Sequence, residues 1–174
     1  MALLSYVCQA SVDQQNLLAK FPQLFDVDTA VGDQLDKIGV WAGVSRNLKQ
    51  EVMGVSVLPD DSYRVLIKLF IAQNQWDGNV PEMYTIWNTL FGAEGFQILV
   101  QDYQDMSMAI VFINPPTDVL ILAILTQGYF LLRPAGVMID GFFKPSVPGG
   151  PLFGFDAENA TVSGFDVGDW VIPV

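Results

Sequence analysis

The chain has 174 residues, of which 51% are apolar and only 16% charged, and its 19 Asp and Glu against 8 Lys and Arg give a formal net charge of -11. This charge repels phosphate backbones, so nucleic acid is excluded as a partner. The longest uninterrupted apolar run, residues 119–125, is far shorter than the roughly 20 residues of a membrane-spanning helix. So much apolar surface on a short, weakly charged chain favours a permanent interface with another protein.

The sequence contains no histidine and one cysteine, Cys8. Without histidine, neither a Ser-His-Asp nor a Cys-His nucleophile can form, and the usual zinc ligand sets cannot be assembled. A single cysteine excludes an intrachain disulfide and fits synthesis in a reducing cytoplasm, and we interpret Cys8 as a packed side chain. Residues 1–15 lack the basic segment of a signal peptide. We predict no enzyme activity and no catalytic, cofactor-binding or metal-binding residues.

The N-terminal region, residues 1–59, is predicted to be helical with loops. A first helix is expected within residues 3–18, and a second begins near Asp28 or Thr29. The core face of the second helix is predicted from helical spacing to be Leu35, Ile38 and Trp41. Residues 51–59 are short and rich in β-branched side chains, which favours a loop or an extended segment.

Two glycines of the second helix, Gly39 and Gly43, indicate close packing or the end of the helix.

The next helix is predicted over residues 63–75, with Asp60 and Asp61 placing a cap and negative charge at its start. Apolar residues lie on more than one side of this helix, so we expect it to be buried from more than one side.

A turn at residues 77–78 separates this helix from the following one. Asn79 is predicted to cap the following helix, with Glu82 three residues further on as in a capping box. Gly92 is expected to end it.

The pattern then changes to that of strands. Residues 96–101 alternate between apolar and polar, whereas residues 106–113 are nearly all apolar, which predicts a central strand covered on both faces. Thr117 is expected to cap a short helix, and residues 137–143 to form a last strand. We therefore predict an α+β fold: N-terminal helices, then a small β-β-α-β domain with a three-stranded sheet over residues 60–143.

The C-terminal segment, residues 144–174, is rich in Pro, Gly, aromatic and acidic residues, and Gly-Phe-Asp occurs twice in it, ten residues apart. A disordered tail would normally lack such aromatic residues, so we predict an extended arm that becomes ordered on a partner. The predicted partner-binding residues are Leu152, Phe153, Phe155, Asp156, Phe165, Asp166 and Trp170.

Carboxylate chemistry is the remaining route to catalysis. Asp102 and Asp105 flank a predicted hairpin turn, and two further pairs precede helices, at residues 26 and 28 and at residues 60 and 61. We interpret all three pairs as turn or cap residues. The acids of the arm have no EF-hand spacing, so we interpret them as facing solvent or a partner and not calcium.

A family resemblance is carried by two blocks of sequence, DTAVGDQLDKIGVWAGVSR at residues 28–46 and DDSYRVLIKLFIAQNQWDGNVPEMYTIWNTLF at residues 60–91. The matching positions of the first block are Gly32, Leu35, Asp36, Ile38, Gly39, Gly43, Val44 and Arg46. Those of the second are Asp60, Asp61, Tyr63, Arg64, Asn74, Trp76, Asp77 and Gly78. The chain resembles tail protein I-like wedge subunits, a phage family encoded beside the baseplate J-like protein in contractile-tail phages.

The resemblance implies a structural protein of the virion, made in the cytoplasm of the host bacterium. It implies assembly with baseplate J-like wedge proteins, two per copy, and a link to the tail fibres or a fibre adaptor, for which we assign the arm. The alternatives are a tail hub, tail-completion or fibre-adaptor protein and, more remotely, a carboxylate-dependent cell-wall hydrolase that uses Asp102 and Asp105. From the residues themselves, we also predict an ion pair between Asp36 and Arg46.

Overall fold

The computed structural model describes residues 2–116, 118–129, 132–155 and 158–174, and their side chains except those of residues 2–8 and 94. The chain divides into two compact units, Met1–Phe70 and Ile71–Val174. The division falls within the helix Asp60–Gln75. The predicted regions, residues 1–59, 60–143 and 144–174, stay a prediction.

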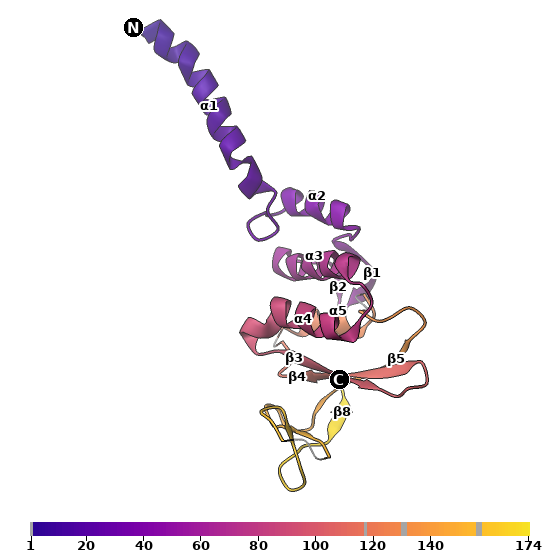
Figure 1. Cartoon of the computed structure of the whole chain (residues 1–174). Helices are drawn as coiled ribbons and strands as arrows, with labels where there is room; N and C mark the ends of the chain where they lie inside the picture. The colour runs from indigo at the N-terminus through magenta and orange to yellow at the C-terminus, as the bar shows by residue number, and fades with distance from the viewer. Residues whose placement is uncertain (1, 117, 130–131, 156–157) are drawn as a thin grey trace. The chain divides into compact units, whose positions relative to one another are not determined.

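The first unit is mainly helical (Figure 1). Its elements are α1 (Ala2–Leu24), α2 (Asp33–Ala42), β1 (Asn47–Val52), β2 (Val55–Val57) and most of α3 (Asp60–Gln75). The two strands pair antiparallel, with Val52 opposite Val55. Met53 and Gly54 form the turn between them with φ angles of 53° and 79°, the positive φ pair of a tight hairpin turn. The segment predicted as a loop or extended is therefore largely a hairpin.

The buried face of α2 differs from the prediction at one position. Leu35 and Ile38 are buried as expected, whereas Trp41 is 74% exposed. Ala42 completes the buried face in its place, because it lies one heptad after Leu35 and returns to the same side of the helix. The Trp41 ring instead lies near the ring of Phe25, with 6.0 Å between their centroids.

The two glycines of α2 have different roles. A Cβ atom at Gly39 would lie 1.8 Å from the hydroxyl oxygen of Tyr63, a buried residue of α3 whose hydroxyl donates to the Val44 carbonyl at 3.0 Å. Gly39 therefore permits the close approach of α2 and α3 that the sequence indicated. Gly43 has a φ of 86° and ends the helix in the left-handed conformation.

Adding a methyl group at Gly39 tests this close approach. We expect Gly39→Ala to lower the free energy of unfolding by about 2 kcal/mol, because the Tyr63 ring has to move out of its buried position. Urea unfolding followed by circular dichroism measures the change. Gly164→Ala is the matched control, since a Cβ there meets no heavy atom within 4 Å. Equal stability of the two variants would show that the ring moves at no cost.

Helix α3 begins three residues earlier than predicted and is buried on two sides. Asp60 and Asp61 lie in its first turn, as expected. Ile67 and Leu69 are both almost fully buried. Because these two positions, i and i+2, are separated by roughly 200° around the helix axis, they lie on opposite sides of the helix. The prediction of burial from more than one side is confirmed.

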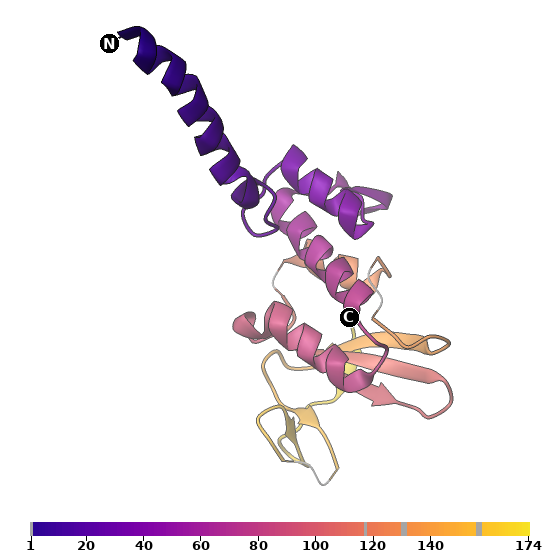
Figure 2. The ribbon, with the colours of Figure 1, turned by 45° about the horizontal axis from the view of Figure 1, so that its top comes forward.

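The second unit contains the main sheet (Figures 1 and 2). Its helices are the end of α3, α4 (Val80–Phe91), the 3-10 turn η1 (Gly92–Glu94) and α5 (Val119–Thr126). Its strands are β3 (Gln97–Asp102), β4 (Ser107–Ile113), β5 (Met138–Pro145), β6 (Leu152–Phe153), β7 (Val162–Ser163) and β8 (Val171–Pro173). The four-stranded sheet has the order β3-β4-β5-β8, with β4 and β5 parallel and both outer pairs antiparallel.

This sheet contains the predicted β-β-α-β succession, β3, β4, α5 and β5, but the prediction of three strands is wrong. The fourth strand, β8, comes from the C-terminal segment and pairs with β5. This strand is only three residues long, so its sequence shows no alternation of apolar and polar residues that would predict a strand. Its last residue, Pro173, has no backbone N–H and therefore fits an edge position.

The helix caps of this unit are largely as predicted. The Asn79 side chain accepts a hydrogen bond from the Glu82 N–H at 2.7 Å. The Glu82 carboxylate, however, accepts from the N–H of Asp77 at 3.1 Å, not from that of Asn79 as in a regular capping box. Asp118 caps α5 by accepting from the Leu120 N–H. The predicted cap residue Thr117 lies outside the described residues.

The core of this unit lies on both faces of the sheet, which confirms the prediction for the central strand β4. On the face covered by α4, five aromatic rings pack together: Trp87, Phe91, Phe96, Phe112 and Phe142. Phe112 is fully buried, and its ring centroid lies 5.4 Å from that of Phe96 and 5.5 Å from that of Phe142. On the opposite face, Val111 and Ile113 pack with Leu152 from the C-terminal segment.

Candidate partner-binding surface

The C-terminal arm, residues 144–174, is folded back on itself, and the prediction of an extended arm is wrong. Strands β6 and β7 pair in parallel, and Leu152 forms a further bridge with Asp169. The Phe153 N–H donates to the Asp169 carbonyl at 2.9 Å, and the Ser146 N–H donates to the Trp170 carbonyl at 2.8 Å. These backbone hydrogen bonds hold parts of the arm to each other, and β8 attaches the arm to the main sheet.

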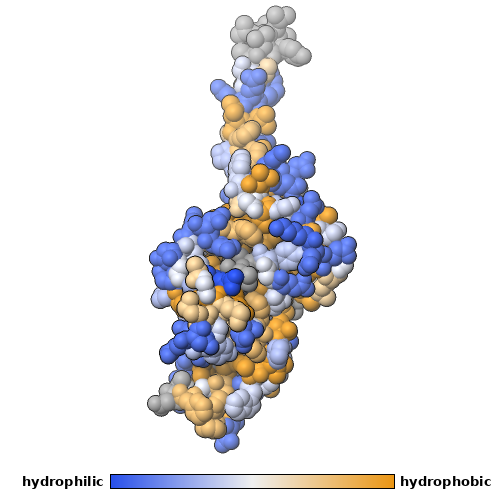
Figure 3. Space-filling view, turned by 90° about the vertical axis from the view of Figure 1, so that its right-hand side faces the viewer, coloured by the Kyte–Doolittle hydropathy of each residue, from blue (hydrophilic) through white to orange (hydrophobic). Residues whose placement is uncertain are grey.

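Four aromatic rings gather on the arm, and we call Phe153, Phe155, Phe165 and Trp170 the aromatic patch. Phe153 is central: its ring centroid lies 5.0, 4.9 and 5.0 Å from those of the other three. The outer three residues are 78, 72 and 70% exposed. Apolar residues are visible at the surface of the arm, at the lower end of Figure 3. Clustered exposed aromatic residues of this kind mark interaction sites.

The sequence repeat explains part of this arrangement. Phe155 and Phe165 hold equivalent positions in the two Gly-Phe-Asp copies, and their rings lie against each other at 5.8 Å. Of the other predicted residues, Leu152 is buried and anchors the arm, and Asp166 is exposed with a φ of 72°. Asp156 lies outside the described residues. That these residues bind a partner stays a prediction.

Beside the aromatic patch lies a groove of about 540 Å³, which we call the arm groove. One wall comes from the sheet face that the arm covers and the other from the arm itself. The residues that define the walls are Leu99, Val111, Phe143, Phe153, Asp169 and Trp170. Among the described residues, Asp169 is the one charged residue of the lining. The prediction missed this groove because its sheet wall depends on the pairing of distant strands.

The net charge of the chain is concentrated in the second unit. Residues 71–174 contain eleven Asp and Glu but only two basic residues, Arg133 and Lys144. Residues 1–70 contain eight acidic and six basic residues and are close to balanced. The arm after Lys144 has four acids and no base. The second unit as a whole is therefore strongly acidic, which disfavours acidic partners.

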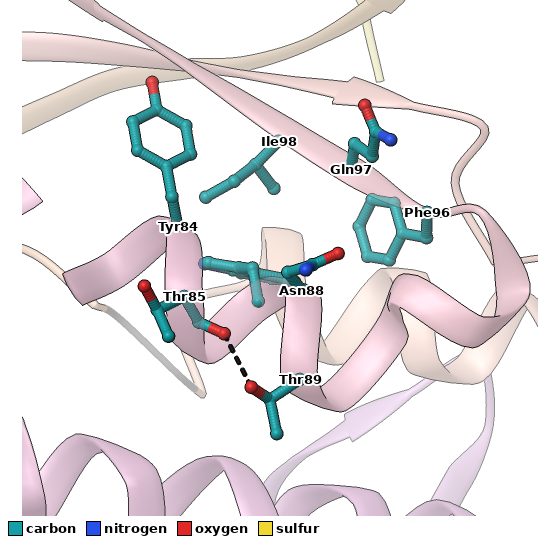
Figure 4. A pocket seen from close by; sticks show the side chains of 8 residues that line it. Tyr84, Thr85, Asn88, Thr89, Phe96, Gln97 and Ile98 are labelled. Carbon is teal, nitrogen blue, oxygen red and sulfur yellow. Dashed lines mark hydrogen bonds between the residues drawn. The ribbon is translucent and has the colours of Figure 1, made fainter. Parts of the chain in front are cut away.

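A second hollow, of about 370 Å³, lies between α4 and β3 (Figure 4). Tyr84, Thr85, Asn88 and Thr89 come from α4, and the Thr89 hydroxyl donates to the Thr85 carbonyl at 2.8 Å. Among the described residues, its lining offers hydroxyl and amide groups but no carboxylate, so these residues do not supply the acid pair of a glycoside hydrolase. The Tyr84 hydroxyl accepts from the Val100 N–H at 3.0 Å, on the outer edge of β3.

The aspartates considered as catalytic have structural roles. The carboxylate of Asp102 accepts from the Gln104 N–H at 2.8 Å, and that of Asp105 from the Ser107 N–H at 3.1 Å. These bonds stabilise the turn between β3 and β4, as the sequence predicted. In the part of the chain that the structure describes, no cluster of His, Cys, Asp or Glu is placed to hold a metal ion, and no helix is long and apolar enough to cross a membrane.

The two sequence blocks that carry the family resemblance meet at Arg46. Its guanidinium donates to Asp36 at 2.6 Å and to Asp60 at 2.5 Å, which confirms the predicted ion pair and adds a second one. The same group donates to the carbonyls of Leu58 and Gly32. The Gly32 N–H and the Arg46 guanidinium lower the pKa of the Asp60 carboxyl. Arg46 therefore holds the start of α3 against α2.

Arg64, in the second block, fixes the loop before α2. It donates to the carbonyls of Val27 and Ala30 at 2.9 and 2.8 Å. On the same helix, Lys68 forms an ion pair with Asp28, which lowers the pKa of the Asp28 carboxyl. The motif residues of the first unit thus maintain its fold.

Helix α1 presents a second exposed surface. It extends to Leu24, beyond the predicted end, and every side chain over residues 9–23 is exposed. Val12, Leu17 and Phe21 are apolar residues among them. The side chain of Cys8 lies outside the described part, so its predicted packing stays a prediction.

Comparisons with known proteins identify the family. A comparison with curated proteins gives no significant match. The family described as bacteriophage baseplate wedge 1 protein matches over residues 1–57 and 52–140. The matched segments include both resemblance blocks and end early in β5, before the arm. The chain therefore belongs to the bacteriophage baseplate wedge 1 protein family, whose members are structural components of the phage baseplate.

Proposed function

We propose that this chain is a wedge subunit that joins the baseplate J-like proteins to the tail fibres through two separate surfaces, α1 and the arm. Membership of the family gives the structural role in the baseplate. The observation that carries the proposal is the aromatic patch, with three of its four residues at least 70% exposed. Aromatic side chains in such positions supply most of the energy of many protein interfaces.

The arm has the properties of a preformed binding surface. The arm is attached to the main sheet through β8 and is held together internally by the β6–β7 pairing, so its backbone has less conformational freedom to lose on binding. The family match ends before the arm. We therefore propose that the arm binds the tail fibre or the fibre adaptor. The family-matched region, in turn, binds the J-like proteins.

Helix α1 has the pattern of a helix that packs against other helices. Leu17, Phe21 and Leu24 follow the alternating spacing of four and three residues that marks a helix-packing face. Leu18 widens this face beyond a narrow two-helix seam. An isolated helix in water is only marginally stable, so packing with helices of the J-like partners would stabilise α1.

Co-expression of the full-length chain with the J-like protein and the fibre adaptor of the same phage tests both assignments. We expect Phe21→Asp to reduce co-purification of the J-like protein at least tenfold, because a charge enters the packing face. Phe165→Asp should leave that complex intact and reduce binding of the adaptor by a similar factor. Val31→Asp, at another exposed apolar residue, is the control. Unchanged binding of both partners by the two variants would refute the proposal.

A further inference from the structure

We infer that the arm groove and the aromatic patch form one receptor for a basic segment of a partner protein, in which an apolar side chain enters the groove and a neighbouring Lys or Arg pairs with Asp169. The inference rests on the proposed function of the arm and adds the chemistry of its partner. Four observations support it: the apolar walls, the single carboxylate, the surrounding charge and the continuity of the two surfaces.

The walls of the groove select an apolar anchor. Leu99, Val111 and Phe143 line it from the sheet, and Phe153 and Trp170 from the arm. A volume of about 540 Å³ lies within the range of sites that enclose small organic groups. An aliphatic or aromatic side chain that enters such a groove gains the free energy of burying its apolar surface.

Asp169, the single carboxylate among the described residues of the lining, favours a cation in the partner. The backbone of Asp169 is fixed at both ends: its N–H donates to the Pro151 carbonyl at 2.8 Å, and its carbonyl accepts from the Phe153 N–H at 2.9 Å. In the described part of the chain, no Lys or Arg forms an ion pair with this carboxylate. A Lys or Arg next to the apolar anchor would meet a carboxylate whose backbone is already fixed.

The net negative charge of residues 71–174 disfavours an acidic occupant of the groove. With eleven acids against two bases, residues 71–174 repel acidic proteins. A second copy of this chain that bound through its own second unit would bring the same negative charge to the contact, and such a contact is disfavoured for the same reason. A basic segment is attracted, and the exposed face of Trp170 offers a further site for a cation.

The groove and the patch are continuous, which favours one occupant over two. Phe153 and Trp170 line the groove and also belong to the aromatic patch, and their ring centroids are 5.0 Å apart. A segment anchored in the groove therefore extends directly over the rings of Phe155 and Phe165. We expect its cation to lie close to the anchor in sequence, because Asp169 is part of the groove wall.

Binding of synthetic peptides to the full-length protein tests the inference. Overlapping peptides that cover the other tail proteins of the same phage are screened, and the tightest binder is titrated by fluorescence polarisation. We expect this peptide to carry Lys or Arg beside Leu, Ile, Met or Phe. Asp169→Asn should weaken its binding about tenfold, and Trp170→Ala roughly thirtyfold. Raising the salt concentration should weaken the wild type more than Asp169→Asn.

Matched controls separate local from general effects. Glu158→Gln removes one charge of the arm outside the groove lining, and Trp41→Ala removes an equally exposed indole from the other unit. Both should change binding less than twofold. Circular dichroism of each variant verifies that it is folded.

The outcomes distinguish this inference from the proposed function. A tightest peptide without Lys or Arg, or equal effects of Asp169→Asn and Glu158→Gln, would overturn the basic partner. A loss of binding in Trp170→Ala would still keep the arm as a binding surface. No binding by any peptide would overturn the inference of a segment receptor. The arm assignment would then be judged by co-purification with the intact adaptor.

Discussion

Arg46→Ala is expected to lower the free energy of unfolding of the first unit by about 3 kcal/mol. The Arg46 side chain is only 16% exposed and pairs with both Asp36 and Asp60. Its removal leaves two neighbouring carboxylates and the carbonyls of Gly32 and Leu58 without their donor, and breaking a largely buried pair from one side is costly. Urea unfolding measures the total loss, and hydrogen exchange over residues 30–70 locates it.

Two further variants define the role of this guanidinium. Arg46→Lys keeps the charge but cannot donate in several directions at once, so we expect an intermediate loss of 1–2 kcal/mol, about half that of alanine. Lys37→Ala removes an exposed cation of α2 and should change stability by less than about 0.5 kcal/mol. Equal stability of Arg46→Ala and Lys37→Ala would show that the cluster contributes nothing to the fold.

The same cluster makes the stability of the first unit depend on pH in the acidic range. The pKa of the Asp60 carboxyl is lowered below its ordinary value of 3.8 by the Gly32 N–H and Arg46. A carboxyl with a lowered pKa in the folded state stabilises the fold above the pKa of the unfolded chain, and this contribution is lost as the pH falls through the folded value. The stability of the wild type should therefore fall more steeply below about pH 4 than that of Arg46→Ala.

Phe112→Ala is expected to lower the free energy of unfolding of the second unit by about 4 kcal/mol. Phe112 is fully buried at the centre of the ring cluster on the α4 face of the sheet, between Phe96 and Phe142. Truncation removes the apolar contacts of the ring and leaves a cavity that the paired strands cannot close. Thermal and urea unfolding measure the loss.

The control for Phe112 is the same substitution on the arm. Phe155 is 78% exposed, so we expect Phe155→Ala to change stability by less than about 0.5 kcal/mol. The pair therefore separates an aromatic residue of the core from one that is available to a partner. A loss for Phe155→Ala comparable to that of Phe112→Ala would show that the aromatic patch is part of the core and would weaken its assignment as a binding surface.

Features that depend on neighbouring residues could be predicted from the sequence. The Asn79 cap, the first-turn acids of α3 and the two-sided burial of β4 all follow from residues a few positions apart. The wedge family was also identified from its sequence blocks, and the match over residues 1–140 confirms that resemblance. The pair between Asp36 and Arg46 was predicted across ten residues because both belong to one block.

Features that depend on distant pairing could not be predicted. The fourth strand, β8, is defined only by its hydrogen bonds to β5, so its three residues carry no pattern of their own. The arm groove requires the sheet and the arm to be in place together. Trp41 was placed in the core because helical spacing tolerates either of two neighbouring positions, and the smaller Ala42 occupies the buried one.

Both edges of the main sheet are blocked against strand addition, which matters for a protein that works in a crowded assembly. On one edge, the outward N–H of Val100 in β3 already donates a hydrogen bond to the Tyr84 hydroxyl. On the other, β8 is only three residues long and ends in Pro173, which has no N–H to offer. Open edges would pair between neighbouring copies and lead to aggregation. The sheet is therefore protected at both edges against pairing with strands of neighbouring proteins.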